Sequence, residues 1–240
     1  MSMTLSQDGV LPLAMRNELL EGLQALEKER LLPHLEKIEL ASGDSLGESG
    51  KPMSHAYCPM DAVVSLLGAL DDGTSTEIAM VGGEGMVGVS LVMGGSNLPG
   101  RAVVQRAGIA HRLKGERIQD EFHRGGAFQK QLLCYMQTLM IHISQIAICN
   151  RHHALDQQLC RWLLTSLDRL PTHELVLTQE FMGNMLGVRR EGVTESAGKL
   201  QKAGLISYHR GRIAILDKKG LEARACECYW AIKMGCGYSL

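Results

Sequence analysis

The spacing of hydrophobic positions changes along the chain, and each change predicts a different kind of structure. Between residues 16 and 35 leucines recur at helical intervals until Pro33 interrupts them. Within residues 38–113 the apolar residues instead form short β-prone runs, at 62–70, 76–81, 102–105 and 109–113, separated by glycine-containing turns. Beyond Glu116 the helical spacing returns and continues to about Asn150. We therefore predict a short helix, an antiparallel sandwich or roll, and a long helix.

The long helix carries the heptad spacing of a coiled coil. Its seam comprises Leu132, Met136, Leu139, Ile143, Ile146 and Asn150. An asparagine in such a seam is a residue that fixes the pairing register. We expect this helix to join two copies of the chain into a homodimer. The alternative is one amphipathic helix lying on its own β-roll, since the seam is shorter than four heptads.

A further helix is predicted over residues 157–170, with Leu159, Trp162, Leu163 and Leu167 on its buried face and Pro171 at its end. Residues 151–156 would form the hinge before it.

The segment 177–206 has the pattern of a helix-turn-helix. Thr178 is placed to cap a helix that ends at Gly187, because glycine adopts the left-handed conformation at little cost. A second helix is expected from about 189 to 203, with Val193, Ala197 and Leu200 facing inward. Arg189, Arg190, Glu191 and Thr194 then point outward near its N-terminus, where a recognition helix meets base edges. The alternative is a helical hairpin with solvated arginines.

Two short β-prone runs follow, at 205–209 and 212–216, joined through Arg210 and Gly211. A hairpin at this place is the wing of a winged helix-turn-helix. Residues 178–219 hold eight Lys and Arg against four acids, whereas the whole chain has a net charge of −1. The basic surface expected of a DNA-binding module is therefore local.

Composition favours two domains in 240 residues that are 45% hydrophobic. No uninterrupted apolar stretch is long enough to span a membrane, and the first residues do not resemble a signal peptide, so we expect a cytoplasmic protein without a membrane partner. The seven cysteines are scattered and odd in number, which makes a disulfide framework improbable. An aromatic content of 4% argues against a stacking platform for single-stranded nucleic acid.

The order of β-roll, long helix and winged helix-turn-helix resembles the Crp/Fnr family of bacterial transcription regulators over nearly the whole chain. The resemblance is strongest from Thr178 to Ile206. It implies a homodimer, a pseudo-palindromic double-stranded DNA site and contact with RNA polymerase. The family's three base-reading positions fall on Arg190, Glu191 and Glu195, and the third is commonly an arginine. Because Glu195 cannot make the guanine contact of an arginine, the family's usual operator is not expected here.

The residues that hold a cyclic nucleotide in some family members are only partly matched. The glycine and arginine of the ribose and phosphate site fall on Gly88 and Arg101, but Val89 and Ala102 replace the residues that follow them. Glu84 restores a carboxylate only at a different spacing, and the adenine-contacting threonine falls on Ile143, followed by Ser144. We therefore expect no tight cyclic-nucleotide binding. No iron–sulfur cluster is expected either, because the first cysteine is Cys58.

Two groups of possible metal ligands lie outside these motifs. Cys149, His152 and His153 share a helical face, with Asp156 a turn further, and Cys226, Cys228 and Cys236 lie near the chain end. Cys149, His152 and His153 are three ligands rather than four, so we predict a structural or interface role for the first group, with a metal or redox sensor as the alternative. The second group could bind metal with a histidine, but a Cys-x-Cys near a chain end is not specific, so we predict a free, oxidation-prone tail and no metal site. No catalytic motif occurs, which predicts a protein that is not an enzyme.

Together with the family resemblance, these features predict an α+β fold. Its parts would be a jelly-roll-like antiparallel β-roll at 1–120, which the resemblance makes a cyclic-nucleotide-binding-like sensor, a dimerisation helix and hinge at 121–155, and a winged helix-turn-helix DNA-binding domain at 156–240. The expected DNA-binding residues are Thr178, Gln179, Arg189, Arg190, Glu191, Thr194, Glu195, Lys199, Arg210 and Arg212. The effector is unknown. A different hypothesis is a ligand-binding sensor whose winged module contacts another protein rather than DNA.

Overall fold

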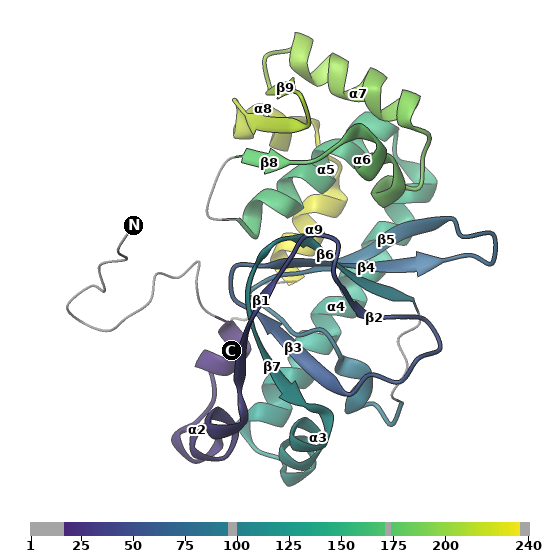
Figure 1. Cartoon of the computed structure of the whole chain (residues 1–240). Helices are drawn as coiled ribbons and strands as arrows, with labels where there is room; N and C mark the ends of the chain where they lie inside the picture. The colour runs from purple at the N-terminus through teal and green to yellow at the C-terminus, as the bar shows by residue number, and fades with distance from the viewer. Residues whose placement is uncertain (1–16, 96–99, 171–173, 236–240) are drawn as a thin grey trace, which may run out of the picture.

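The computed structural model describes residues 17–95, 100–170 and 174–235. After short N-terminal helices the chain forms a β-roll, as predicted (Figure 1). One sheet has the order β1–β7–β3 and the other the order β2–β6–β4–β5, with every pair antiparallel. The strands are β1 (Glu36–Leu40), β2 (Ser45–Gly47), β3 (His55–Pro59), β4 (Val63–Ala69), β5 (Ser75–Val81), β6 (Arg101–Arg106) and β7 (Gly108–Lys114). The four predicted runs correspond to β4 to β7.

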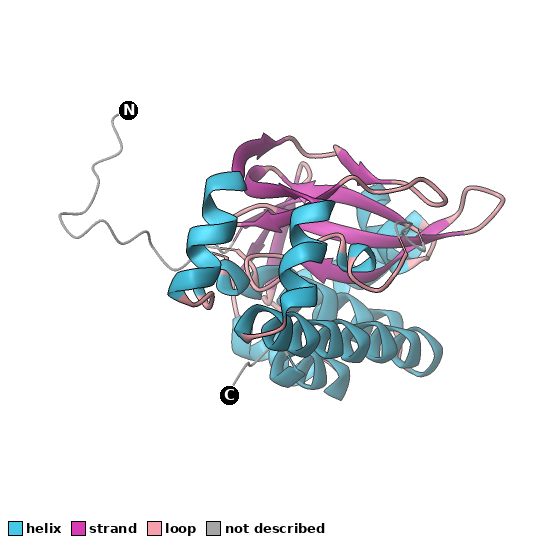
Figure 2. Ribbon diagram, turned by 90° about the horizontal axis from the view of Figure 1, so that it is seen from below, coloured by secondary structure: helices cyan, strands magenta, loops and turns pink. Residues whose placement is uncertain are grey.

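Helices flank the roll on either side in the sequence. The predicted N-terminal helix is divided into α1 (Glu18–Glu21), α2 (Ala25–Leu31) and the short 3-10 helix η2 (Leu32–His34), and a second 3-10 turn, η3 (Val89–Leu91), interrupts the roll. The long helical segment is also divided, into α3 (Gly115–Arg124) and α4 (Ala127–His152). Gly125 and Gly126 separate them at φ values of 79° and 95°, a conformation that favours glycine. Figure 2 shows helices lying along one side of the strands.

The C-terminal half consists of α5 (Leu155–Asp168), α6 (Gln179–Leu186), α7 (Arg190–Lys202), α8 (Lys218–Arg224) and α9 (Glu227–Gly235), with the three-stranded sheet β8 (Glu174–Val176), β10 (Arg212–Ile215), β9 (Ile206–His209). The sequence pattern predicted α5 to α7 and the β9–β10 hairpin within about two residues, which is the usual precision of such boundaries. It did not show β8, α8 or α9. Helix α9 lies along α4 and returns the chain to the N-terminal half.

Strand β4 is buried on both faces, and its two faces belong to two different cores. Val64 packs inside the roll with the buried residues of α4, whereas Val63 and Leu67 pack against α5 and the helix-turn-helix. This division follows from the alternation of side chains along a strand. The β-roll and the C-terminal half therefore share strand β4, which forms a common wall between them.

A bulge in β5 brings a carboxyl group to this wall. The pairing with β4 shifts between Leu66 and Leu67, so that Leu67 lies opposite Glu77 and Ile78 is skipped. Glu77 is consequently only 3% exposed. Its Oε1 accepts a hydrogen bond of 2.9 Å from the Trp162 indole of α5, and its Oε2 accepts one of 2.6 Å from Ser65.

Burial raises the pKa of Glu77 to about 7, although its two hydrogen bonds and the positive charges of Arg161 and Arg169 favour the carboxylate. The ordinary pKa of a glutamate is 4.5, so at pH values between 4.5 and about 7 the folded chain holds a proton on Glu77 that the unfolded chain has lost. The free energy of unfolding therefore falls as the pH rises through this window and levels off above it.

The variant Glu77→Gln is expected to remove this pH dependence, because a neutral amide keeps an acceptor for Trp162 and donates to Ser65. Between pH 4.5 and 7 the wild type should lose on the order of 3 kcal/mol of unfolding free energy relative to the variant. Urea unfolding followed by tryptophan fluorescence at a series of pH values measures the difference. The control Glu116→Gln, at an exposed position, should keep the wild-type profile. Parallel profiles for wild type and Glu77→Gln would contradict the assignment.

Candidate nucleic-acid interface

The pair α6 and α7 forms a compact helix-turn-helix. Thr178 caps α6, since its hydroxyl oxygen accepts a hydrogen bond of 3.1 Å from the Phe181 amide. Gly187 ends α6 in the left-handed conformation, at φ 66° and ψ 32°. Both roles are those expected from the sequence.

The turn packs directly on a glycine of the first helix. The Val188 amide donates to the Gly183 carbonyl oxygen at 2.9 Å, and a Cβ on Gly183 would lie 2.9 Å from the Val188 carbonyl oxygen. Real Cβ atoms do not approach a carbonyl oxygen so closely, so the backbone at Gly183 leaves no room for a side chain. This close approach sets how far apart the two helices lie.

The N-terminal end of α7 presents charged side chains to solvent. Arg189 is the N-cap residue, Arg190 and Glu191 form the first turn, and all three are exposed. Within the described part of the chain, no hydrogen bond or ion pair holds these three side chains. They are therefore available to a partner.

The other exposed residues of this surface contact one another. The Thr194 hydroxyl lies 2.8 Å from Gln179 Oε1 and 2.9 Å from the Arg190 carbonyl oxygen, which links α7 to the start of α6. Glu195 forms an ion pair of 2.8 Å with Lys199. That ammonium group lowers the pKa of the Glu195 carboxyl, so Glu195 remains ionised at neutral pH.

The wing turns through two residues in the left-handed region. Arg210 has φ 48° and Gly211 has φ 76°, as a two-residue hairpin of the I′ type requires. Arg210 and Arg212 are both exposed. Strand β10 pairs with β9 on one side and β8 on the other, so the wing is a three-stranded sheet.

The residues expected to hold an effector occupy separate environments. Glu84 forms an interdomain ion pair of 2.7 Å with Arg169, in which both side chains are largely buried. Gly88 caps η3 in the left-handed conformation, Arg101 is exposed at the start of β6, and Ala102 is fully buried beside it. On α4, Ile143 is half-buried and Ser144 exposed.

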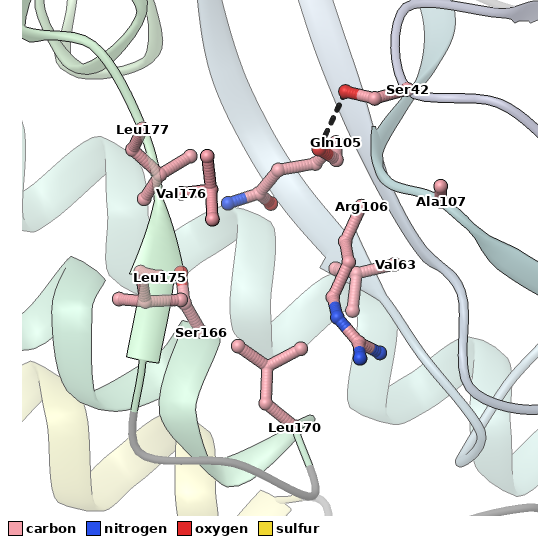
Figure 3. A pocket seen from close by; sticks show the side chains of 10 residues that line it. All are labelled: Ser42, Val63, Gln105, Arg106, Ala107, Ser166, Leu170, Leu175, Val176 and Leu177. Atoms are coloured by element: carbon pink, nitrogen blue, oxygen red, sulfur yellow. Dashed lines mark hydrogen bonds between the residues drawn. The ribbon is translucent and has the colours of Figure 1, made fainter. Parts of the chain in front are cut away.

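The described residues form a pocket of about 340 Å³ at a different place, between the β-roll and the C-terminal half. Figure 3 shows Arg106 and Val63 on one side of it and Leu170 and Leu175 on the other. The Ser42 hydroxyl donates to the Gln105 carbonyl oxygen at 3.1 Å across its edge. None of the predicted effector residues lines this pocket.

The structure divides the predicted dimer seam between two faces of α4. Leu132, Leu139 and Ile146 are at most 8% exposed, because the chain's own residues cover them. Met136 and Ile143 are half-buried, and Asn150 is exposed. The free face adds the exposed apolar side chains Leu133 (49%), Met140 (67%) and Ile148 (48%).

Helix α4 is also long and apolar enough to cross a membrane by length and composition, a property shared by core helices of soluble proteins. Its packing in the roll through Leu132 and Tyr135 identifies one side of it as a core helix.

A recognition-type helix with free arginines at its N-terminus, followed by a β-wing, defines the winged helix-turn-helix class. A family model described as a Crp-like helix-turn-helix domain matches residues 157–224. Residues 157–224 therefore form a Crp-like helix-turn-helix domain.

Several solved structures superpose over most of the chain. A protein from Eubacterium rectale assigned to the Crp/Fnr family has a TM-score of 0.69 at 19% identity, covering 86% of this chain and 97% of that one. FixK2 from Bradyrhizobium japonicum has a TM-score of 0.67 at 14% identity, covering 80% and 98%. The c-di-GMP responsive regulator CLP of Xanthomonas campestris has a TM-score of 0.63 at 16% identity, covering 80% of this chain and 99% of that one. No curated protein sequence matches the chain significantly.

The two helical glycines Gly183 and Gly198 make opposite predictions. Gly183→Ala should lower the free energy of unfolding by about 1 to 3 kcal/mol, because the new Cβ meets backbone. Gly198→Ala, where nothing lies within 4 Å of the new Cβ, should raise it by about 0.5 to 1 kcal/mol through helix propensity. Denaturant unfolding of both variants measures these changes. Equal free energies of unfolding for the two variants would contradict the close approach of the turn to Gly183.

Proposed function

We propose that the chain is a transcription regulator that binds a pseudo-palindromic double-stranded DNA site as a homodimer. The observation that carries this proposal is the group of uncommitted charged side chains at the N-terminus of α7, Arg189, Arg190 and Glu191. A helix N-terminus and planar guanidinium groups suit phosphate and guanine edges.

Arg190 and Glu191 are the proposed base-reading residues. An arginine pairs with both acceptors of guanine, and a carboxylate accepts from the cytosine amino group. Glu195 differs from them because Lys199 already engages it. In the proposed complex either this ion pair opens or Glu195 lies beside the bases while still paired with Lys199. In neither case does Glu195 bind a guanine as an arginine would, so the operator differs at this position from one that an arginine reads.

The remaining residues of the surface are assigned to positioning. Thr178 and Gln179 lie at the start of α6, Thr194 is bonded to Gln179, and Lys199 with the wing residues Arg210 and Arg212 adds positive charge around α7. Contacts of this kind bind phosphates and fix the register of the protein on the duplex.

The proposed dimer uses the free face of α4. Leu133, Met136, Met140, Ile143 and Ala147 follow one another at intervals of three and four, which is the spacing of a coiled-coil seam. Two of these residues, Met136 and Ile143, belong to the seam predicted from the sequence. A two-fold pairing through this face would place two recognition helices about 34 Å apart, as successive major grooves require.

The signal is proposed to act on the β-roll (1–120) and to reach the winged domain (156–240) through the helix and hinge at 121–155. Two features support weak or no cyclic-nucleotide binding: Glu84 is engaged by Arg169, and Ile143 offers no hydroxyl. A regulator of this kind works in the cytoplasm with RNA polymerase and without a membrane partner, so the apolar face of α4 is assigned to a second copy of the chain.

The variant Arg190→Ala is expected to lose about 1 to 3 kcal/mol of specific binding free energy, the range for a lost bidentate base contact. The operator is first selected from a random duplex pool with the wild type, and titrations then compare operator with random DNA at several salt concentrations. Arg117→Ala, an exposed arginine on α3, is the control and should bind as the wild type does.

If Arg190→Ala discriminates between operator and random DNA as well as the wild type does, Arg190 does not read bases. A wild type that selects no duplex from the pool would favour the other hypothesis, a sensor whose winged module contacts a protein.

The variant Met140→Glu should weaken the dimer on the order of 100-fold, because a carboxylate would be buried at the seam without a partner. The matched control is Leu70→Glu at the tip of the β4–β5 hairpin, where the side chain is 68% exposed against 67% for Met140. Analytical ultracentrifugation across a concentration series measures both. Identical dissociation constants would place the dimer contact elsewhere.

A further inference from the structure

Three cysteines and a histidine from distant parts of the chain meet at the junction between the sensor and the DNA-binding half. Cys149 lies in the last turn of α4 and His153 directly follows that helix, whereas Cys226 precedes α9 and Cys228 lies in its first turn. One ligand atom from each residue lies within 4.8 Å of all the others.

Two of the six distances between these atoms match those of a tetrahedral site, and all six are at most 4.8 Å. A zinc ion with three sulfur ligands at about 2.3 Å and one nitrogen at about 2.0 Å holds its ligands roughly 3.5 to 3.8 Å apart. The Sγ atoms of Cys149 and Cys226 are 3.5 Å apart, and Cys228 Sγ lies 3.6 Å from His153 Nδ1. The ion would therefore fit with only small movements of the side chains.

The groups around the cluster are those that support a metal ligand. His153 directs Nδ1 at the cluster, and its Nε2 lies 3.3 Å from the Glu227 carboxylate. A carboxylate on the far nitrogen of a ligating histidine fixes the tautomer and the orientation of the ring. The Arg161 guanidinium donates from Nε to Cys149 Sγ at 3.2 Å.

Charge gives an independent reason to expect an ion here. Arg161 is 2% exposed, and its buried Nη1 has no hydrogen-bond partner among the described residues. A buried cation is stabilised by nearby negative charge. Glu77 is one acidic group close enough to interact with Arg161, but the atom that Arg161 Nε contacts is Cys149 Sγ, and a neutral thiol carries no charge. Three thiolates around Zn²⁺ carry one net negative charge, which would balance the charge of Arg161.

We propose that Cys149, His153, Cys226 and Cys228 bind one structural zinc ion. Three thiolates and an imidazole in a closed, buried, four-coordinate arrangement are a ligand set of structural zinc sites. The site would fasten α9 to the end of α4, at the start of the connection to α5. It lies apart from the DNA-binding surface and departs from the expectation of no metal site.

The two groups recognised in the sequence are thus halves of one site. His152, expected on the same face as Cys149, is exposed and takes no part, and Asp156 is likewise outside the cluster. Cys236, expected with the other two C-terminal cysteines, lies outside the described residues.

The test is the zinc content of the full-length protein, purified under reducing conditions, incubated with Zn²⁺ and passed through gel filtration. We expect one zinc per chain in the wild type and in His152→Ala, and a loss of bound zinc in His153→Ala. Glu227→Gln should keep the ion but weaken its affinity about 10- to 100-fold in a chelator competition. With Co²⁺ in place of zinc, the wild type should show the strong visible absorption of a tetrahedral thiolate complex.

Circular dichroism of each variant shows whether it folds. A second measurement needs no variant: the thermal unfolding midpoint of the wild type should fall when a chelator removes the zinc. Less than stoichiometric zinc in the wild type would overturn the proposal. Equal zinc content in His152→Ala and His153→Ala, or a Cys149–Cys226 disulfide in peptide mapping of the reduced preparation, would do the same.

Discussion

A hydrogen bond between two buried groups, the Trp162 indole and the Glu77 carboxyl, joins the two halves of the molecule. Helix α5 carries Trp162 and is buried at every position from 158 to 167, because it lies between strands β4 and β5, helix α7 and the C-terminal helices α8 and α9. A helix surrounded in this way cannot move without disturbing all its neighbours. The position of α7, and therefore of its arginines, depends on how α5 sits against β4 and β5.

Other contacts hold the same arrangement from different sides. The ion pair of Glu84 and Arg169 joins the roll to the end of α5, and the Thr76 hydroxyl donates to the Met185 carbonyl oxygen of α6 at 3.1 Å. The cysteine and histidine cluster lies at the opposite end of α5. A signal that alters the roll or the pairing of α4 would reach α7 through these rigid contacts, which gives the proposed regulation a physical route.

The sequence predicted best where local interactions decide the structure. The cap and the left-handed glycine that delimit α6 depend on neighbouring residues alone, so the helix-turn-helix was predictable. Long-range packing decided the rest. Leu132 and Met140 are both apolar residues of α4, but only the fold shows that the chain covers the first and exposes the second. The bulge that buries Glu77 instead of Ile78 leaves no sequence signal, and Cys149 and Cys226 lie 77 positions apart.

In the proposed function, two copies of this chain read DNA with the N-terminal ends of their α7 helices. A methylation-protection footprint on the selected duplex tests it most directly, because guanine N7 lies in the major groove. Two protected half-sites related by two-fold symmetry are expected, with centres ~34 Å apart, which is one helical turn. A single protected half-site, or protection confined to the minor groove, would contradict it.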